Sequence, residues 1–162
     1  MDRDHATHAP DADRTALSDS GLDGWERAIL RLMRAIFADL AATTRPEGMS
    51  GDDPRVLALR IFGPDRGPGT LQATSDLIRA MATERRDVFH FSNPCCPGCA
   101  RQLTRDEARL VAILHQLRRS RPGNAMIEAM MLCPTGTITL VMAAAGQLLG
   151  HAPAIGADTA RT

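Results

Sequence analysis

Apolar residues recur at intervals of three and four over residues 24–42, among them Trp25 and Ile29, while charged residues such as Arg34 fall on the opposite side. A period close to 3.6 predicts an amphipathic helix that buries one face and solvates the other. Asp23, followed by Glu26 three positions later, is typical of a capping box at a helix start. We therefore expect a helix over residues 24–42, with Arg34 on its solvated face.

The next apolar stretch, residues 54–62, follows an aspartate and begins with a proline, which together predict the start of a short helix. A strand is the alternative, because Leu57, Leu59 and Ile61 alternate with polar residues or alanine. Five of the seven residues over 63–69 are glycine or proline, and this composition predicts a loop. Further helices are expected at residues 70–84, 104–120, 125–132 and 136–149.

The helices expected at residues 104–120 and 125–132 contain residues whose roles the sequence also predicts. Thr104 and Glu107 form a second capping-box pattern, so we expect both Glu107 and its neighbour Asp106 to serve helix capping rather than acid–base chemistry. His115 lies between apolar residues of the same helix and is expected at the edge of the core. The methionines of the following helix have helical spacing and are expected in the core: Met126, Met130 and Met131.

Composition supports a helical fold. The chain has 162 residues, enough for one domain with a core, and 44% of them are hydrophobic but only 3% aromatic. A core of aliphatic residues and alanine favours helices over strands. We predict an all-α fold, a small bundle of five to six helices with a cysteine-bearing turn between helices. Residues 21–150 form the domain, residues 1–20 an acidic disordered tail, and residues 151–162 a flexible tail.

The charges are unevenly distributed although the formal net charge is zero. Residues 1–24 hold six acidic and two basic residues, whereas residues 84–123 hold eight arginines and four acidic residues. Arg101, Arg105 and Arg109 flank one predicted helix, which makes a nucleic-acid surface conceivable. A solvated face, or pairing with the acidic tail, is the simpler interpretation, so a DNA-binding transcriptional regulator stands as an alternative function.

Cysteines carry the clearest chemical signal. Cys95, Cys96 and Cys99 lie in a turn rich in proline and glycine, and Cys133 follows a later predicted helix. Thiolates are preferred ligands of zinc, and a two-residue spacing such as that of Cys96 and Cys99 is common in zinc knuckles. We expect the four cysteines to converge on one Zn²⁺ ion from two segments, with His90 as the nearest substitute ligand.

Other interpretations of the cysteines stay open. Cys96 and Cys99 could form a disulfide in response to oxidants, and four thiolates could hold an iron–sulfur cluster. Either chemistry would make the protein a thiol-redox or iron–sulfur sensor. The interpretation without a functional site is that Cys95 or Cys133 is a small buried hydrophobic residue and that the turn has no chemical role.

The expected function is binding rather than catalysis. No Ser-His-Asp arrangement or pair of carboxylates indicates an enzyme, and a zinc tetrahedron made of cysteines would leave no open position. The N-terminus lacks a signal-peptide pattern, and no apolar run has membrane-spanning length. We therefore expect a small cytoplasmic zinc protein that acts as a regulator or adaptor, with a protein partner and no membrane partner.

Overall fold

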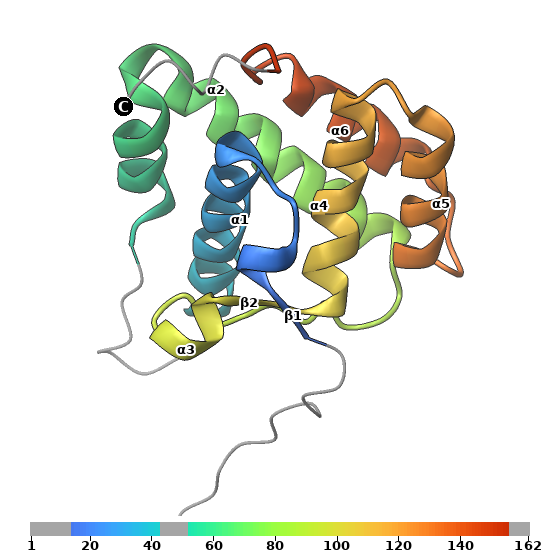
Figure 1. Cartoon of the computed structure of the whole chain (residues 1–162), viewed down its shortest axis with the longest axis horizontal. Coiled ribbons are helices and arrows are strands. Elements are labelled where there is room, and N and C mark those ends of the chain that lie inside the picture. Colours follow the sequence, from blue (N-terminus) through green and yellow to red (C-terminus); the bar gives the residue numbers. More distant parts are fainter. Residues whose placement is uncertain (1–13, 43–51, 156–162) are drawn as a thin grey trace, which may run out of the picture.

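The computed structural model describes residues 14–42 and 52–155, and these form an all-α fold (Figure 1). A short 3₁₀ helix, η2, spans Leu17–Asp19, and strands β1 and β2 span Thr15–Ala16 and Gln102–Leu103. The six α-helices of this part of the chain are α1 (Gly24–Ala42), α2 (Pro54–Glu84), α3 (Pro97–Ala100), α4 (Arg105–Arg118), α5 (Pro122–Leu132) and α6 (Thr139–Leu149). The predicted helical bundle is confirmed.

Capping residues define the helix starts as the sequence predicts. At α1 the Asp23 side chain accepts from the Glu26 amide at 2.9 Å, and the Glu26 side chain accepts from the Asp23 amide at 3.0 Å. At α4 the reciprocal pair is Thr104 and Glu107. Asp53 caps α2 by accepting from the Arg55 amide. These short-range hydrogen bonds satisfy amides that the helix itself leaves free.

The segment expected to be a loop, residues 63–69, is largely helical, and in this detail the prediction was wrong. Only Gly63 leaves the helical conformation, with φ at 79° and ψ at 172°, and α2 changes direction there (Figure 1). A positive φ is accessible to glycine at little cost. Pro64 then stands at the start of the second helical segment, where a missing amide hydrogen costs little. The expected helix at 54–62 is confirmed.

Aliphatic side chains fill the core between the long helices. Helix α1 packs on α2, α2 packs on α6, and α4 packs on α5 (Figure 1). Each of these helices contributes side chains that are fully or almost fully buried, including Ile29, Leu77, Leu114, Ala129 and Leu148. The burial of this apolar surface is the main favourable contribution to folding.

A short N-terminal arm lies against the segment that follows the cysteines. Strand β1 pairs antiparallel with β2, with Thr15 opposite Leu103, and the Leu17 amide donates to the Arg101 carbonyl at 2.8 Å. The arm belongs to the stretch that the sequence assigned to an acidic tail. The rest of that stretch, residues 1–13, and residues 156–162 of the predicted C-terminal tail lie outside the described residues.

Helix α5 exposes the methionines that we expected in the core, so that prediction was wrong. Met126, Met130 and Met131 are 47–58% exposed, and Ile127 beside them is 59% exposed. The side of α5 that packs on α4 carries the smaller residue Ala125 and others like it. Because α5 is apolar on both sides, its periodicity does not indicate which side is buried. No helix in the described ranges has the length and apolar character needed to cross a membrane.

Candidate functional site

The turn that carries three cysteines is held by hydrogen bonds within itself. The Asn93 side chain accepts from the Cys95 amide at 2.9 Å, and the Asn93 carbonyl accepts from the Cys96 amide at 3.2 Å. An asparagine side chain that bonds two residues ahead is a common turn former. Pro97 then starts the single turn of α3. The local sequence therefore fixes the chain around Cys96.

Cys96 and Cys99 lie together across this turn. The Cys99 amide donates to Cys96 Sγ at 3.3 Å. The neighbouring Cys99 side chain, and after it the Cys99 amide, lower the pKa of Cys96, and Arg14 adds a favourable charge. The Cys96 side chain in turn raises the pKa of Cys99, with burial as a smaller cause. Cys96 is thus the first of the two to ionise.

This arrangement resembles that of dithiols that form a disulfide. A thiolate is the nucleophilic form of cysteine, and a Cys-X-X-Cys spacing commonly lowers the pKa of one member. Residues three apart on a helical turn have Cβ atoms about 5–6 Å apart, so a modest adjustment would bring the two sulfurs of Cys96 and Cys99 within bonding distance. The second cysteine can then attack a bond formed at the first.

Cys133 is placed elsewhere. It is 1% exposed, and burial raises the pKa of its thiol, as does the nearby charge of Glu84. Helices α4 and α5 pack together, and the end of α5 brings Cys133 to the end of α2 rather than to the cysteine turn. Arg85, next to Glu84, donates to the Leu132 carbonyl at 2.9 Å and so joins these two ends.

The structure therefore does not assemble the expected site of Cys95, Cys96, Cys99 and Cys133. Within residues 14–42 and 52–155, no three or more His, Cys, Asp or Glu side chains form a group that could hold a metal ion. The chain leaves the cysteine turn through β2, whereas Cys133 follows α5 at the end of α2. Zinc binding itself stays a prediction.

His90 and the arginines proposed for nucleic acid are dispersed. His90 Nδ1 lies 3.3 Å from Asp106 Oδ2, so its nearest partner is a carboxylate and not a cysteine. Arg101 and Arg105 are exposed, whereas Arg109 is half-buried, and one of its nitrogens is buried without a hydrogen bond. Nucleic-acid binding by Arg101, Arg105 and Arg109 stays a prediction.

A buried ion pair that the sequence did not reveal fixes the turn to α1. Arg34 is 3% exposed and bonds both carboxylate oxygens of Glu107, at 2.7 and 2.9 Å. Its remaining donors bond the carbonyls of Ala100 and Gln102, directly after the cysteines. Our placement of Arg34 on the solvated face was wrong, because Glu107, 73 positions away, provides a buried partner. Helical periodicity cannot detect such a distant partner.

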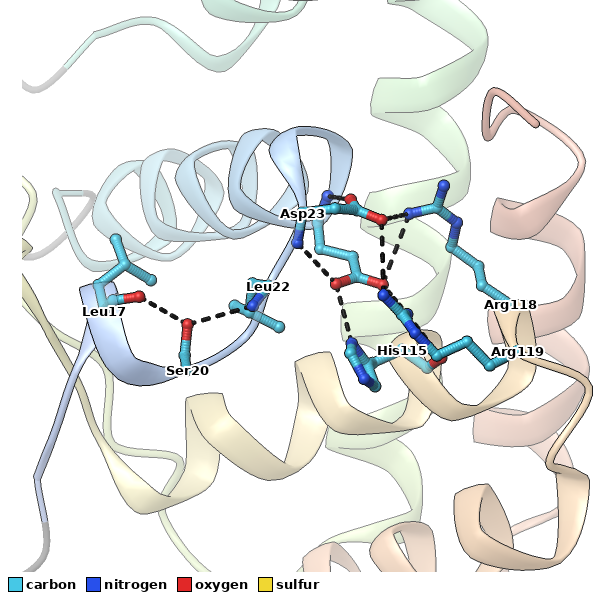
Figure 2. Close-up of polar contacts among 8 residues, drawn as sticks. Leu17, Ser20, Leu22, Asp23, His115, Arg118 and Arg119 are labelled. Carbon is cyan, nitrogen blue, oxygen red and sulfur yellow. Dashed lines mark hydrogen bonds and ion pairs between the residues drawn. The ribbon is translucent and has the colours of Figure 1, made fainter. Parts of the chain in front are cut away.

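A second buried carboxylate joins α1 to α4 (Figure 2). Glu26 is fully buried and lies 3.0 Å from His115 Nδ1 and 2.8 Å from Arg119 Nη1. Burial alone would raise the pKa of Glu26, but hydrogen bonds from His115, Arg119 and the Asp23 amide together hold it below the ordinary value. Arg118 bonds Asp23 beside it. Groups of the chain itself supply the hydrogen-bond partners of these carboxylates. We therefore assign the cluster a structural role.

The cysteine turn is thus the best candidate site, since the buried carboxylates are saturated by the fold. Arg14 is a site residue that the sequence analysis missed. Its proximity to Cys96 depends on the pairing of β1 with β2, which no side-chain pattern in two-residue strands predicts. Comparisons with protein-family models, with curated proteins and with solved structures found no match to this chain.

Proposed function

We propose that this protein is a thiol-based redox regulator in which Cys96 and Cys99 respond together. The observation that carries the proposal is the hydrogen bond from the Cys99 amide to Cys96 Sγ across one turn of chain. A cysteine with a lowered pKa beside a cysteine with a raised pKa has the arrangement needed to form a disulfide reversibly. This function is the redox alternative of the sequence analysis, now limited to one pair.

The proposed reaction needs a small disulfide as oxidant. The Cys96 thiolate attacks one sulfur of that disulfide, a mixed disulfide forms, and the first small thiol leaves. Cys99 then loses its proton and attacks Cys96 Sγ, which releases the second small thiol. Two protein thiols are oxidised and one small disulfide is reduced to two thiols, so electrons balance. Thiols of this kind stay reduced in a cytoplasm, which is where we place the protein.

Oxidation of the pair would act on the rest of the protein through the hydrogen bonds that hold the cysteine turn. Ala100 and Gln102, which follow Cys99, accept hydrogen bonds from Arg34, and β2 pairs with the N-terminal arm. A disulfide would tighten the turn and shift these contacts. The exposed apolar face of α5 supports a protein partner, because large exposed apolar patches commonly bind other proteins.

The test is a thiol titration of the purified full-length chain in glutathione redox buffers. We expect the thiols of Cys96 and Cys99 to be lost together in the native chain, Cys99→Ser to stop at the mixed disulfide on Cys96, and Cys96→Ser to abolish the paired loss. Cys133→Ala is the matched control and should leave the midpoint unchanged. A chain that keeps all four thiols under oxidising conditions would overturn the proposal.

Zinc is the competing prediction, and the same preparation decides between the two. Zinc content is measured on anaerobically purified protein and on each cysteine variant. One zinc per chain that is lost on Cys133→Ala as well as on Cys99→Ser would refute the redox pair in favour of the four-cysteine site. Metal content that depends on none of the four cysteines agrees with the redox proposal.

A further inference from the structure

A cavity of about 400 Å³ lies beside the cysteine turn, between α1 and the start of α2. This volume is in the range of pockets that hold small molecules. Its walls are mainly apolar, with Leu30 from α1, Leu57 from α2 and Ala100 from the turn, and the thiol-bearing Cys95 forms part of its lining. The reactive group at this cavity is therefore Cys95, not the Cys96–Cys99 pair.

The cavity also carries one uncompensated positive charge. Of its charged residues, Arg34 is neutralised by Glu107, and Asp52 is 3.6 Å from Arg60. Arg31 remains, an exposed residue of α1 for which no ion pair or side-chain hydrogen bond occurs within the described part of the chain. A guanidinium at the wall of a small apolar cavity fits a carboxylate ligand, since the two can form paired hydrogen bonds.

We infer that this cavity binds a small disulfide that carries a carboxylate, with the carboxylate on Arg31 and the sulfurs at Cys95. Cys95 as thiolate attacks one sulfur of the ligand, and a Cys95–ligand disulfide forms while the original sulfur–sulfur bond breaks. The leaving thiolate takes up the proton that Cys95 gave up. The inference goes beyond the proposed function, because it concerns a different cysteine and holds whether or not Cys96 and Cys99 form a disulfide.

The experiment uses the full-length Cys96→Ser/Cys99→Ser variant, in which Cys95 is the one exposed thiol, and two probes of similar size. Dithiodipropionate carries carboxylates, and cystamine carries ammonium groups. Mixed-disulfide formation at Cys95 is followed by mass spectrometry. Adding Arg31→Ala should slow the reaction with dithiodipropionate by about two- to fivefold, as expected for a solvent-accessible ion pair, and should not slow the reaction with cystamine.

Arg27→Ala is the matched control, because Arg27 is exposed on the same helix one turn earlier and does not line the cavity. It should leave both rates unchanged. Equal rates for Arg31→Ala and its parent with dithiodipropionate would overturn the inference. So would an equal loss with both probes, which would indicate a general change at Cys95, or an equal effect of Arg27→Ala, which would indicate unspecific attraction.

Discussion

At the scale of single residues, buried carboxylates connect parts of the chain that are distant in sequence. Glu107 binds α1 and the turn through Arg34, and Glu84 accepts from the amides of Leu140 and Val141 at 2.9 and 3.0 Å. Glu84 therefore caps α6 from another helix. A buried charge is costly unless it is paired, so each of these residues depends on its partner.

The Glu107 pair gives a stability prediction. Glu107→Gln leaves the Arg34 guanidinium buried without a countercharge, and we expect a loss of about 3–5 kcal/mol in the free energy of unfolding. Urea denaturation measures this loss. The control Asp76→Asn removes the exposed pair with Arg79 and should cost at most about 1 kcal/mol. Similar losses in the two variants would show that the buried Glu107–Arg34 pair contributes no more to stability than an exposed pair.

The Glu26 cluster gives a pH prediction. The pKa of Glu26 in the folded chain lies below its ordinary value of 4.5, so the unfolded chain binds a proton first as the pH falls. The contribution of Glu26 to stability is then fully present above the unfolded pKa and is lost as pH falls through the folded pKa. We expect the difference in unfolding free energy between the native chain and Glu26→Gln to be constant near neutral pH and to shrink below 4.5.

Urea denaturation over a series of pH values tests this expectation. Other titratable and charged groups lie around Glu26, namely His115, Arg118, Arg119 and Asp23. Because Glu26→Gln keeps these groups, a pH dependence that remains in the variant comes from them and not from the Glu26 carboxylate. A difference that stays constant to about pH 3, well below the usual glutamate range, would contradict the assignment.

At the scale of elements, local sequence signals predicted the helix starts but not the packing. Capping residues correctly marked α1, α2 and α4 because their hydrogen bonds span only two or three residues. The continuation of α2 past Gly63 was missed, since glycine and proline are compatible with a kinked helix as well as with a loop. The exposed side of α5 was missed because both of its sides are apolar.

The connection before α6 gives a prediction at this scale. A Cβ atom on Gly136 would lie 1.9 Å from the Glu84 carbonyl oxygen, closer than any real contact. Gly136→Ala must displace backbone, and we expect it to cost about 1–3 kcal/mol and to lower the thermal midpoint by about 2–4 °C for each of these kcal/mol. Gly123→Ala in α5 is the control, because nothing lies within 4 Å of its added carbon. Equal midpoints for the two variants would refute the close approach.

At the scale of the whole molecule, the sequence predicted the helical bundle. It did not predict which cysteines meet. Cys96 and Cys99 meet because three residues of local chain join them, whereas the position of Cys133 depends on how α5 packs against α2 and α4. Arg14 lies near the turn because β1 pairs with β2 through the backbone, and the pattern of side chains in such short strands does not predict this pairing.

The most direct test of this account is disulfide mapping of the full-length chain after mild oxidation. Cleavage after arginine releases residues 87–101, which carry three cysteines, separately from the peptide that carries Cys133. The account predicts that peptide 87–101 loses two hydrogens through a Cys96–Cys99 bond and that Cys133 stays a free thiol. A cross-link between Cys133 and peptide 87–101 would contradict it, because these thiols would then meet in the folded chain.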